Sequence, residues 1–162
     1  MDGLSDLMEA PDAVVEMTIG AAIGHGALVL LGLLVCLIAG VVAARGSGDL
    51  IGTALVALFG MSILIPGENR FFRAVSATDT RGNWIAIIVF CLLAIGVGWL
   101  ASRISGQSGQ AAAWAGGAAF VSLLIARALD AGSEILSGIP LGWLPAIGLV
   151  VVVLGVVTGK IK

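Results

Sequence analysis

The feature that most limits how this chain can fold is an uncharged segment, residues 19–44, in which small side chains recur at every fourth position. Only one of these seven positions holds a large residue: they are Gly20, Gly24, Leu28, Gly32, Cys36, Gly40 and Ala44. About 20 apolar residues cross a hydrocarbon core of about 30 Å, and this segment would reach about 39 Å as a helix. Small residues at this spacing let a second helix approach closely. The segment therefore predicts a membrane-spanning helix with a close-packing face.

The composition supports a membrane protein over the whole chain. Charged residues make up 11% of the 162 residues, against about 25% in soluble domains. The formal net charge is only -2, and no basic run is present to neutralise phosphates, so nucleic acid is not an expected partner. Residues 1–18 are acidic, weakly amphipathic and without Lys or Arg, which argues against a cleavable signal. We expect an N-terminal arm at 1–18 and a transmembrane domain at 19–162.

Apolar segments divide the chain into five expected helices. They lie near residues 19–44, 50–65, 83–104, 111–131 and 144–159. Pro66 is expected to end the second, and Pro145 suits the first turn of the fifth. The short polar connections at 45–49 and 105–110 favour antiparallel neighbours. The sequence predicts an all-α polytopic membrane protein with about five transmembrane helices in one bundle, whereas re-entrant second or fifth segments are the alternative.

The orientation of the bundle is poorly determined by its charges. With five spans, the positive-inside comparison sets four basic residues on one side against four on the other: Arg45, Arg103, Lys160 and Lys162 against Arg70, Arg73, Arg81 and Arg127. The acidic arm favours an N-terminus outside the cell. Trp84, Trp99, Trp114 and Trp143 fall near segment ends, where tryptophan prefers the headgroup level. We expect a prokaryotic cell membrane or a viral membrane.

Small residues mark the expected packing faces. In lipid, helices associate by close van der Waals approach, because the lipid tails are as apolar as the side chains. The packing positions that we predict are Gly20, Gly24, Gly32, Gly40, Gly98 and Ala115. Such faces recur on most segments, which suggests further neighbours in an oligomer. The alternative is that a chain rich in Gly and Ala produces these patterns by chance.

Polar residues near the segment ends give three weaker hypotheses. His25 could relay protons or bind a metal, or it could bond to a neighbouring helix near the interface. Arg127 and Asp130, three positions apart, are expected to form an interfacial ion pair. The connection at 66–82 could anchor the chain at the membrane edge. Alternatively, it could dock a partner or lipid headgroups through an edge made of Arg70, Phe71, Phe72 and Arg73.

The run at residues 68–73, Glu-Asn-Arg-Phe-Phe-Arg, resembles the segment bearing Arg, Asn and Glu in small four-helix membrane enzymes that use glutathione. In this chain we expect the run to lie in a connection between helices. The polar partners that those enzymes carry inside their helices are missing here. No span centre carries an ionised residue, and no Cys-x-x-Cys motif, phosphate-binding glycine loop or Ser-His-Asp set is present. The sequence therefore predicts neither an enzyme nor a cofactor or metal site.

These observations favour a structural or assembly subunit of a membrane complex. Its partners would be the lipid bilayer and either copies of itself or other membrane subunits, in a larger complex, an envelope or a secretion-type apparatus. The alternative is a small oligomeric channel or transporter with a pore between protomers, lined by backbone and by hydroxyl groups such as those of Thr53, Ser62 and Ser122.

Overall fold

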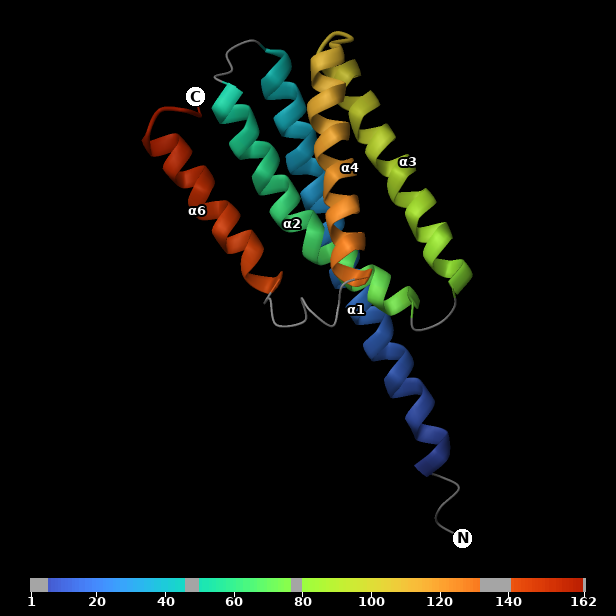
Figure 1. Cartoon of the computed structure of the whole chain (residues 1–162). Helices are drawn as coiled ribbons and strands as arrows, with labels where there is room; N and C mark the ends of the chain where they lie inside the picture. Colours follow the sequence, from blue (N-terminus) through green and yellow to red (C-terminus); the bar gives the residue numbers. More distant parts are fainter. Residues whose placement is uncertain (1–5, 46–49, 77–79, 132–140, 162) are drawn as a thin grey trace.

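The computed structural model (Figure 1) describes residues 6–45, 50–76, 80–131 and 141–161, with side chains described in 24–45, 50–72, 84–129 and 141–161. These residues form helices and no strand: α1 (Asp6–Ala44), α2 (Leu50–Ser76), α3 (Thr80–Ile104), α4 (Gly109–Ala131), the short 3₁₀ helix η1 (Leu141–Trp143) and α6 (Leu144–Val157). The prediction of an all-α helical bundle is confirmed.

Helices α1 to α4 form an antiparallel bundle, and α6 lies outside it against α2 (Figure 1). Four segments are long and apolar enough to cross a membrane: Gly24–Ala44, Leu50–Phe72, Trp84–Ile104 and Gly109–Leu129. Helix α1 runs from Asp6 to Ala44 and includes Pro11. Its first turns project beyond the ends of the other helices (Figure 1).

The fifth expected span is shorter than a bilayer is thick. Helix α6 has 14 residues, a length of about 21 Å against a hydrocarbon core of about 30 Å. Its end is fixed by Gly159, which has a φ of 70°. The N–H of Lys160 donates to the carbonyl oxygen of Gly155 at 2.8 Å, and that of Gly159 to Val156 at 3.0 Å. This glycine cap stops the helix before it can span, so the expected span at 144–159 is corrected to a short helix.

The expected end of the second helix at Pro66 is wrong, because α2 continues to Ser76. Proline removes one backbone hydrogen bond, but neighbouring helices in a membrane bundle tolerate that loss. Here the continuation buries one helix face, with Leu64, Glu68 and Phe72 all at most 2% exposed. These residues are four positions apart and lie in line along α2. The packing of this helix face therefore outweighs the tendency of Pro66 to end the helix.

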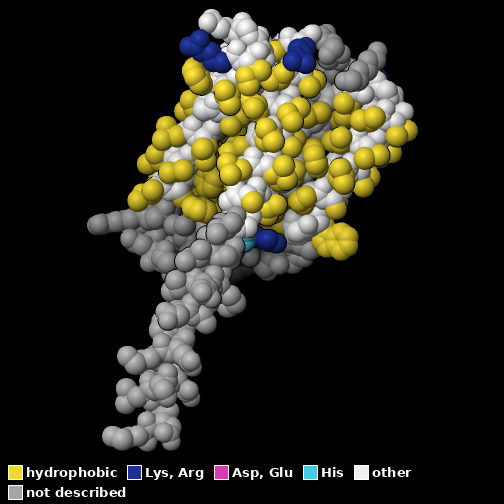
Figure 2. Space-filling view, turned by 180° about the vertical axis from the view of Figure 1, so that it is seen from behind, with side chains coloured by type: hydrophobic (Ala, Val, Ile, Leu, Met, Phe, Trp, Pro, Cys, Tyr) yellow, Lys and Arg dark blue, Asp and Glu magenta, His cyan; other side chains and the backbone are white. Residues whose placement is uncertain are grey.

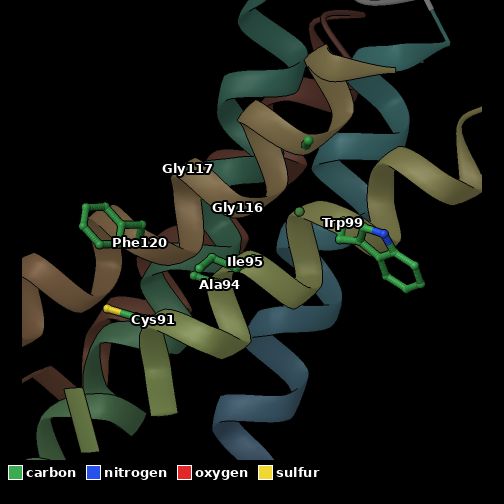
Figure 3. A pocket seen from close by; sticks show the side chains of 9 residues that line it. Cys91, Ala94, Ile95, Trp99, Gly116, Gly117 and Phe120 are labelled. Carbon is green, nitrogen blue, oxygen red and sulfur yellow. The ribbon is translucent and has the colours of Figure 1, made fainter. Parts of the chain in front are cut away.

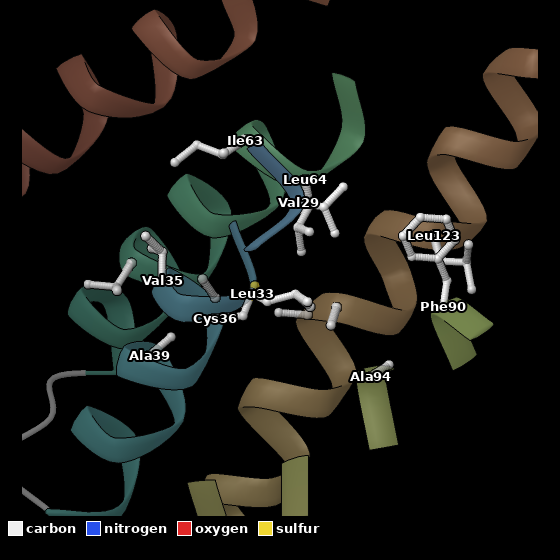
Figure 4. Packing of buried hydrophobic residues seen from close by; sticks show 14 of the residues in the cluster. Val29, Leu33, Val35, Cys36, Ala39, Ile63, Leu64, Phe90, Ala94 and Leu123 are labelled. Carbon is white, nitrogen blue, oxygen red and sulfur yellow. The ribbon is translucent and has the colours of Figure 1, made fainter. Parts of the chain in front are cut away.

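Glycines permit the close contact of α1 with α2. A Cβ atom built on Gly32 of α1 would lie 2.6 Å from Cγ of Leu64 in α2. One built on Gly60 of α2 would lie 2.7 Å from Sγ of Cys36. Side chains of both helices meet between these points (Figure 4). The two backbones thus approach more closely than larger side chains would allow.

The other predicted packing positions differ in their surroundings. A Cβ atom on Gly40 would lie 2.5 Å from the carbonyl oxygen of Ala111 and 2.7 Å from Cβ of Ala115, which is itself 0% exposed. One on Gly98 would lie 3.0 Å from the carbonyl oxygen of Ala112 in α4. Gly24 has nothing within 4 Å, so it makes no such contact within the described chain. The surroundings of Gly20, in α1, lie outside the described residues.

The outer surface of the bundle is apolar, as lipid contact requires. In Figure 2, hydrophobic side chains cover the visible face between Lys and Arg side chains near its two ends. Trp84, Trp99 and Trp143 are more than half exposed. Trp84 begins its span and Trp143 precedes α6, positions that match an aromatic belt. Length, composition and surface together indicate a membrane location.

Candidate functional site

Three buried polar side chains meet between α2 and α4, and we call them the acidic cluster: Glu68, Asn69 and Ser122. They are 2%, 1% and 0% exposed. The Ser122 hydroxyl lies 3.2 Å from Oε2 of Glu68 and 2.8 Å from the carbonyl oxygen of Ala119, so its single proton is shared between two acceptors. The side-chain amide of Asn69 donates to the carbonyl oxygen of Ala126 at 3.3 Å. The cluster therefore joins α2 to α4 by polar contacts.

The acidic cluster lies inside the apolar part of the bundle, near one end. Glu68 precedes the end of its span, Phe72, by one helical turn, or about 6 Å. Ser122 precedes the end of its span, Leu129, by about 10 Å. A carboxyl group at such a depth is costly, and intramembrane ionisable groups commonly mark functional sites. The position of Glu68 therefore makes this cluster the candidate site.

An aromatic and a basic side chain lie beside the acidic cluster. Phe72, one turn after Glu68, is fully buried, and its ring centroid lies 5.6 Å from that of Phe90 in α3. The guanidinium of Arg127 in α4 lies over the Phe72 ring, 5.9 Å from its centroid. Arg127 is half-buried and follows Ser122 by five residues on the same helix. A carboxylate, an amide, a hydroxyl and a guanidinium are thus gathered at one end of the bundle.

The side chains of Glu68 and Arg127 belong to types that recognise charges of opposite sign. A guanidinium recognises carboxylates through paired hydrogen bonds, and a carboxylate accepts hydrogen bonds from an ammonium group. The low dielectric of the bundle strengthens both interactions. The side-chain amide of Asn69 already bonds to α4, so its contribution is to fix the position of the preceding residue, Glu68.

The structure does not form the predicted docking edge as one surface. Phe72 points into the bundle, while Phe71 is 38% exposed and meets the Phe90 ring edge-on at 5.4 Å. Arg70 is exposed and its Nη2 atom approaches η1, 4.0 Å from a Cβ atom built on Gly142. Successive helical residues point about 100° apart, so an edge of consecutive residues requires a loop. Phe72 therefore does not belong to an exposed edge, docking through Arg70 and Phe71 stays a prediction, and the side chain of Arg73 lies outside the described residues.

Two other predicted sites are only partly visible. His25 is half-buried at the second position of the span Gly24–Ala44, which places it close to the interface. Asp130 belongs to α4, but its side chain lies outside the described residues, so the ion pair with Arg127 stays a prediction. Cys36 and Cys91 are both free thiols.

Sequence reasoning missed the acidic cluster because it placed residues 66–82 in a connection. A usable signal was present: positions 64, 65, 68, 69 and 72 continue the helical spacing of α2 across Pro66. Comparisons with models of known protein families, with curated proteins and with solved structures find no match to this chain. The function is therefore inferred from the residues of this chain alone.

Proposed function

We propose that this chain is a membrane-embedded protein that binds a small ligand bearing an ammonium and a carboxylate group, and that it does so at the acidic cluster. The observation that carries the proposal is the buried carboxyl of Glu68, bonded across helices to Ser122. Arg127, at the same end of α4, supplies the opposite charge. A ligand with both charges would pair with both Glu68 and Arg127. A purely structural contact between α2 and α4 would not require two opposite charges.

Glutathione is one ligand with charges of both signs, and residues 68–73 resemble a segment of membrane enzymes that use it. Four helices are long enough to span a membrane, and the run lies within α2 with a polar partner, Ser122, on another helix. Glutathione carries one ammonium and two carboxylate groups. We therefore extend the proposal to glutathione as the ligand.

Glutathione binding to the full chain in lipid nanodiscs, measured by isothermal titration calorimetry, tests this function. We expect saturable binding that Glu68→Gln and Arg127→Ala each weaken by about tenfold or more, because each removes a charged hydrogen-bonding partner. Arg45→Ala is the control, since Arg45 is an exposed arginine outside both the cluster and the run at 68–73. Absence of saturable binding, or equal weakening by Arg45→Ala, would contradict the proposal.

Assembly with copies of itself or with other membrane subunits is the second candidate function. It is favoured by an apolar hollow of about 360 Å³ between α2 and α4. Small residues line much of it, among them Ala54, Ala57, Ala113 and Gly117. Helices in lipid associate through such surfaces, where backbones can approach closely.

Oligomer mass in a mild detergent, measured by light scattering, tests the assembly function. We expect Ala113→Leu, which fills the hollow from its exposed side, to shift the population from oligomer to monomer. Ala146→Leu makes the same change on the exposed surface of α6 and should leave the mass unaltered. A chain that is monomeric before any substitution would rule this candidate out.

We do not propose a pore between protomers, because the hydroxyl groups expected to line it face inward. Thr53, Ser62 and Ser122 are 2%, 8% and 0% exposed. Ser62 donates to the carbonyl oxygen of Phe59 at 2.7 Å, and Ser122 is part of the acidic cluster. These hydroxyl groups pack within one chain, so they do not line a path between protomers.

A further inference from the structure

An apolar groove of about 560 Å³ runs between α3 and α4 on the outer surface (Figure 3). Its floor is backbone, since a Cβ atom built on Gly98 would lie 3.0 Å from the carbonyl oxygen of Ala112 and 3.3 Å from Cα of Gly116. Its walls include Ile95 and Phe120, which are 67% and 45% exposed. The groove faces the surroundings of the bundle, where a membrane supplies acyl chains.

The groove has the depth and direction of an acyl chain in one leaflet. It extends along α3 from Trp99 to Cys91, a distance of about 12 Å. Trp99 lies about 8 Å inside Ile104, where the span ends. The groove therefore begins below the headgroups and reaches the middle of the bilayer, since half the hydrocarbon core is about 15 Å.

A cation lies at the outer end of the groove. The guanidinium of Arg103 is 5.3 Å from the centroid of the Trp99 ring, whose indole lines the groove. Arg103 is exposed, and the following turn, residues 105–108, contains no Asp or Glu. A guanidinium at headgroup depth pairs well with a phosphate group.

The hollow between α2 and α4 provides an internal comparison. It also contains a tryptophan, Trp114, but no cation lies over that ring among the described cation–π contacts. The two recesses share small apolar lining. The α3–α4 groove combines an acyl-sized recess with a basic group at its mouth.

From this combination we infer that the α3–α4 groove is a binding site for an anionic phospholipid. One acyl chain lies over Gly98 and Gly116, and the phosphate pairs with Arg103. The site is separate from the acidic cluster, which lies between α2 and α4 and shares no residue with the groove lining. The inference does not depend on the proposed function.

Native mass spectrometry of the full chain, titrated with phosphatidylglycerol or phosphatidylcholine, tests this site. We expect preferential retention of phosphatidylglycerol, weakened about fivefold by Arg103→Ala, as loss of one basic residue at a membrane surface predicts. Ala112→Leu should also reduce retention, since Ala112 lines the groove but not the α2–α4 hollow. Arg45→Ala removes an exposed cation near the same end of the bundle and is the control.

Three results would overturn the inference. Equal retention of both lipids would show that headgroup charge is not recognised. Equal weakening by Arg45→Ala and Arg103→Ala would indicate unspecific surface attraction. Unchanged retention in Ala112→Leu would show that the acyl chain lies elsewhere, as it would if a second protein chain covered the groove.

Discussion

Gly40→Leu is expected to destabilise the folded bundle more than any other single glycine replacement on α1. A side chain at this position meets the backbone of α4, 2.5 Å from the carbonyl oxygen of Ala111, and no rotamer change can move that atom away. Overpacking of an interior costs up to about 3 kcal/mol, and a backbone obstacle places this variant at the upper end. Thermal unfolding in detergent, followed by circular dichroism, measures the loss.

Gly96→Leu is the matched control, because Gly96 of α3 is exposed and has nothing within 4 Å. Its unfolding temperature should change little. The control also separates two interpretations of the small-residue stripe on α1. If Gly40→Leu altered only the oligomer mass and left unfolding unchanged, the stripe would pack against another chain and the observed contact with α4 would be contradicted.

Phe72→Ala is expected to cost about 3 kcal/mol of unfolding free energy. This value is the lower end for truncating a buried phenylalanine, because lipid is as apolar as the core and only packing is lost. Phe72 is fully buried, contacts the Phe90 ring and lies under the Arg127 guanidinium. The large effect expected of Phe72→Ala depends on α2 remaining helical beyond Pro66.

Phe71→Ala supplies the comparison for Phe72→Ala in the same unfolding assay. Phe71 is 38% exposed and shares only an edge contact with Phe90, so we expect a cost near 1 kcal/mol, the scale of an aromatic pair. A loop after Pro66, as the sequence alone suggested, would give the two variants similar small effects. Equal effects would therefore contradict the helical continuation of α2.

Much of the fold follows from the sequence because length and apolar character decide where a membrane helix lies. The ends of α1, α3 and α4 nearest the short polar connections agree with the segments expected at 19–44, 83–104 and 111–131. One expectation failed where a local signal competed with packing: Pro66 did not end α2, because the following turns bury Phe72 and its neighbours. Helix α6 agrees with the segment expected at 144–159 to within two residues, and its 14 residues are too few to cross the hydrocarbon core.

The candidate site was harder to predict because it is a tertiary feature. Glu68 and Ser122 are 54 positions apart, and only the packing of α2 against α4 brings them together. Glu68 was assigned to a connection once Pro66 was taken as a helix end. Ser122 was then interpreted only as a packing or pore residue. Helical spacing across Pro66 could have indicated that Glu68 faces inward, but not which partner it meets.

The central claim, that Glu68 pairs with the ammonium group of a ligand, is tested most directly by a cycle of ligand and protein changes. Binding of glutathione and of glutathione acetylated at its α-amino group is measured by calorimetry with the unmodified chain and with Glu68→Gln. We predict that acetylation weakens binding about tenfold in the unmodified chain and changes it little in Glu68→Gln, since the partner charge is already absent. An equal loss on acetylation in both proteins would contradict the account.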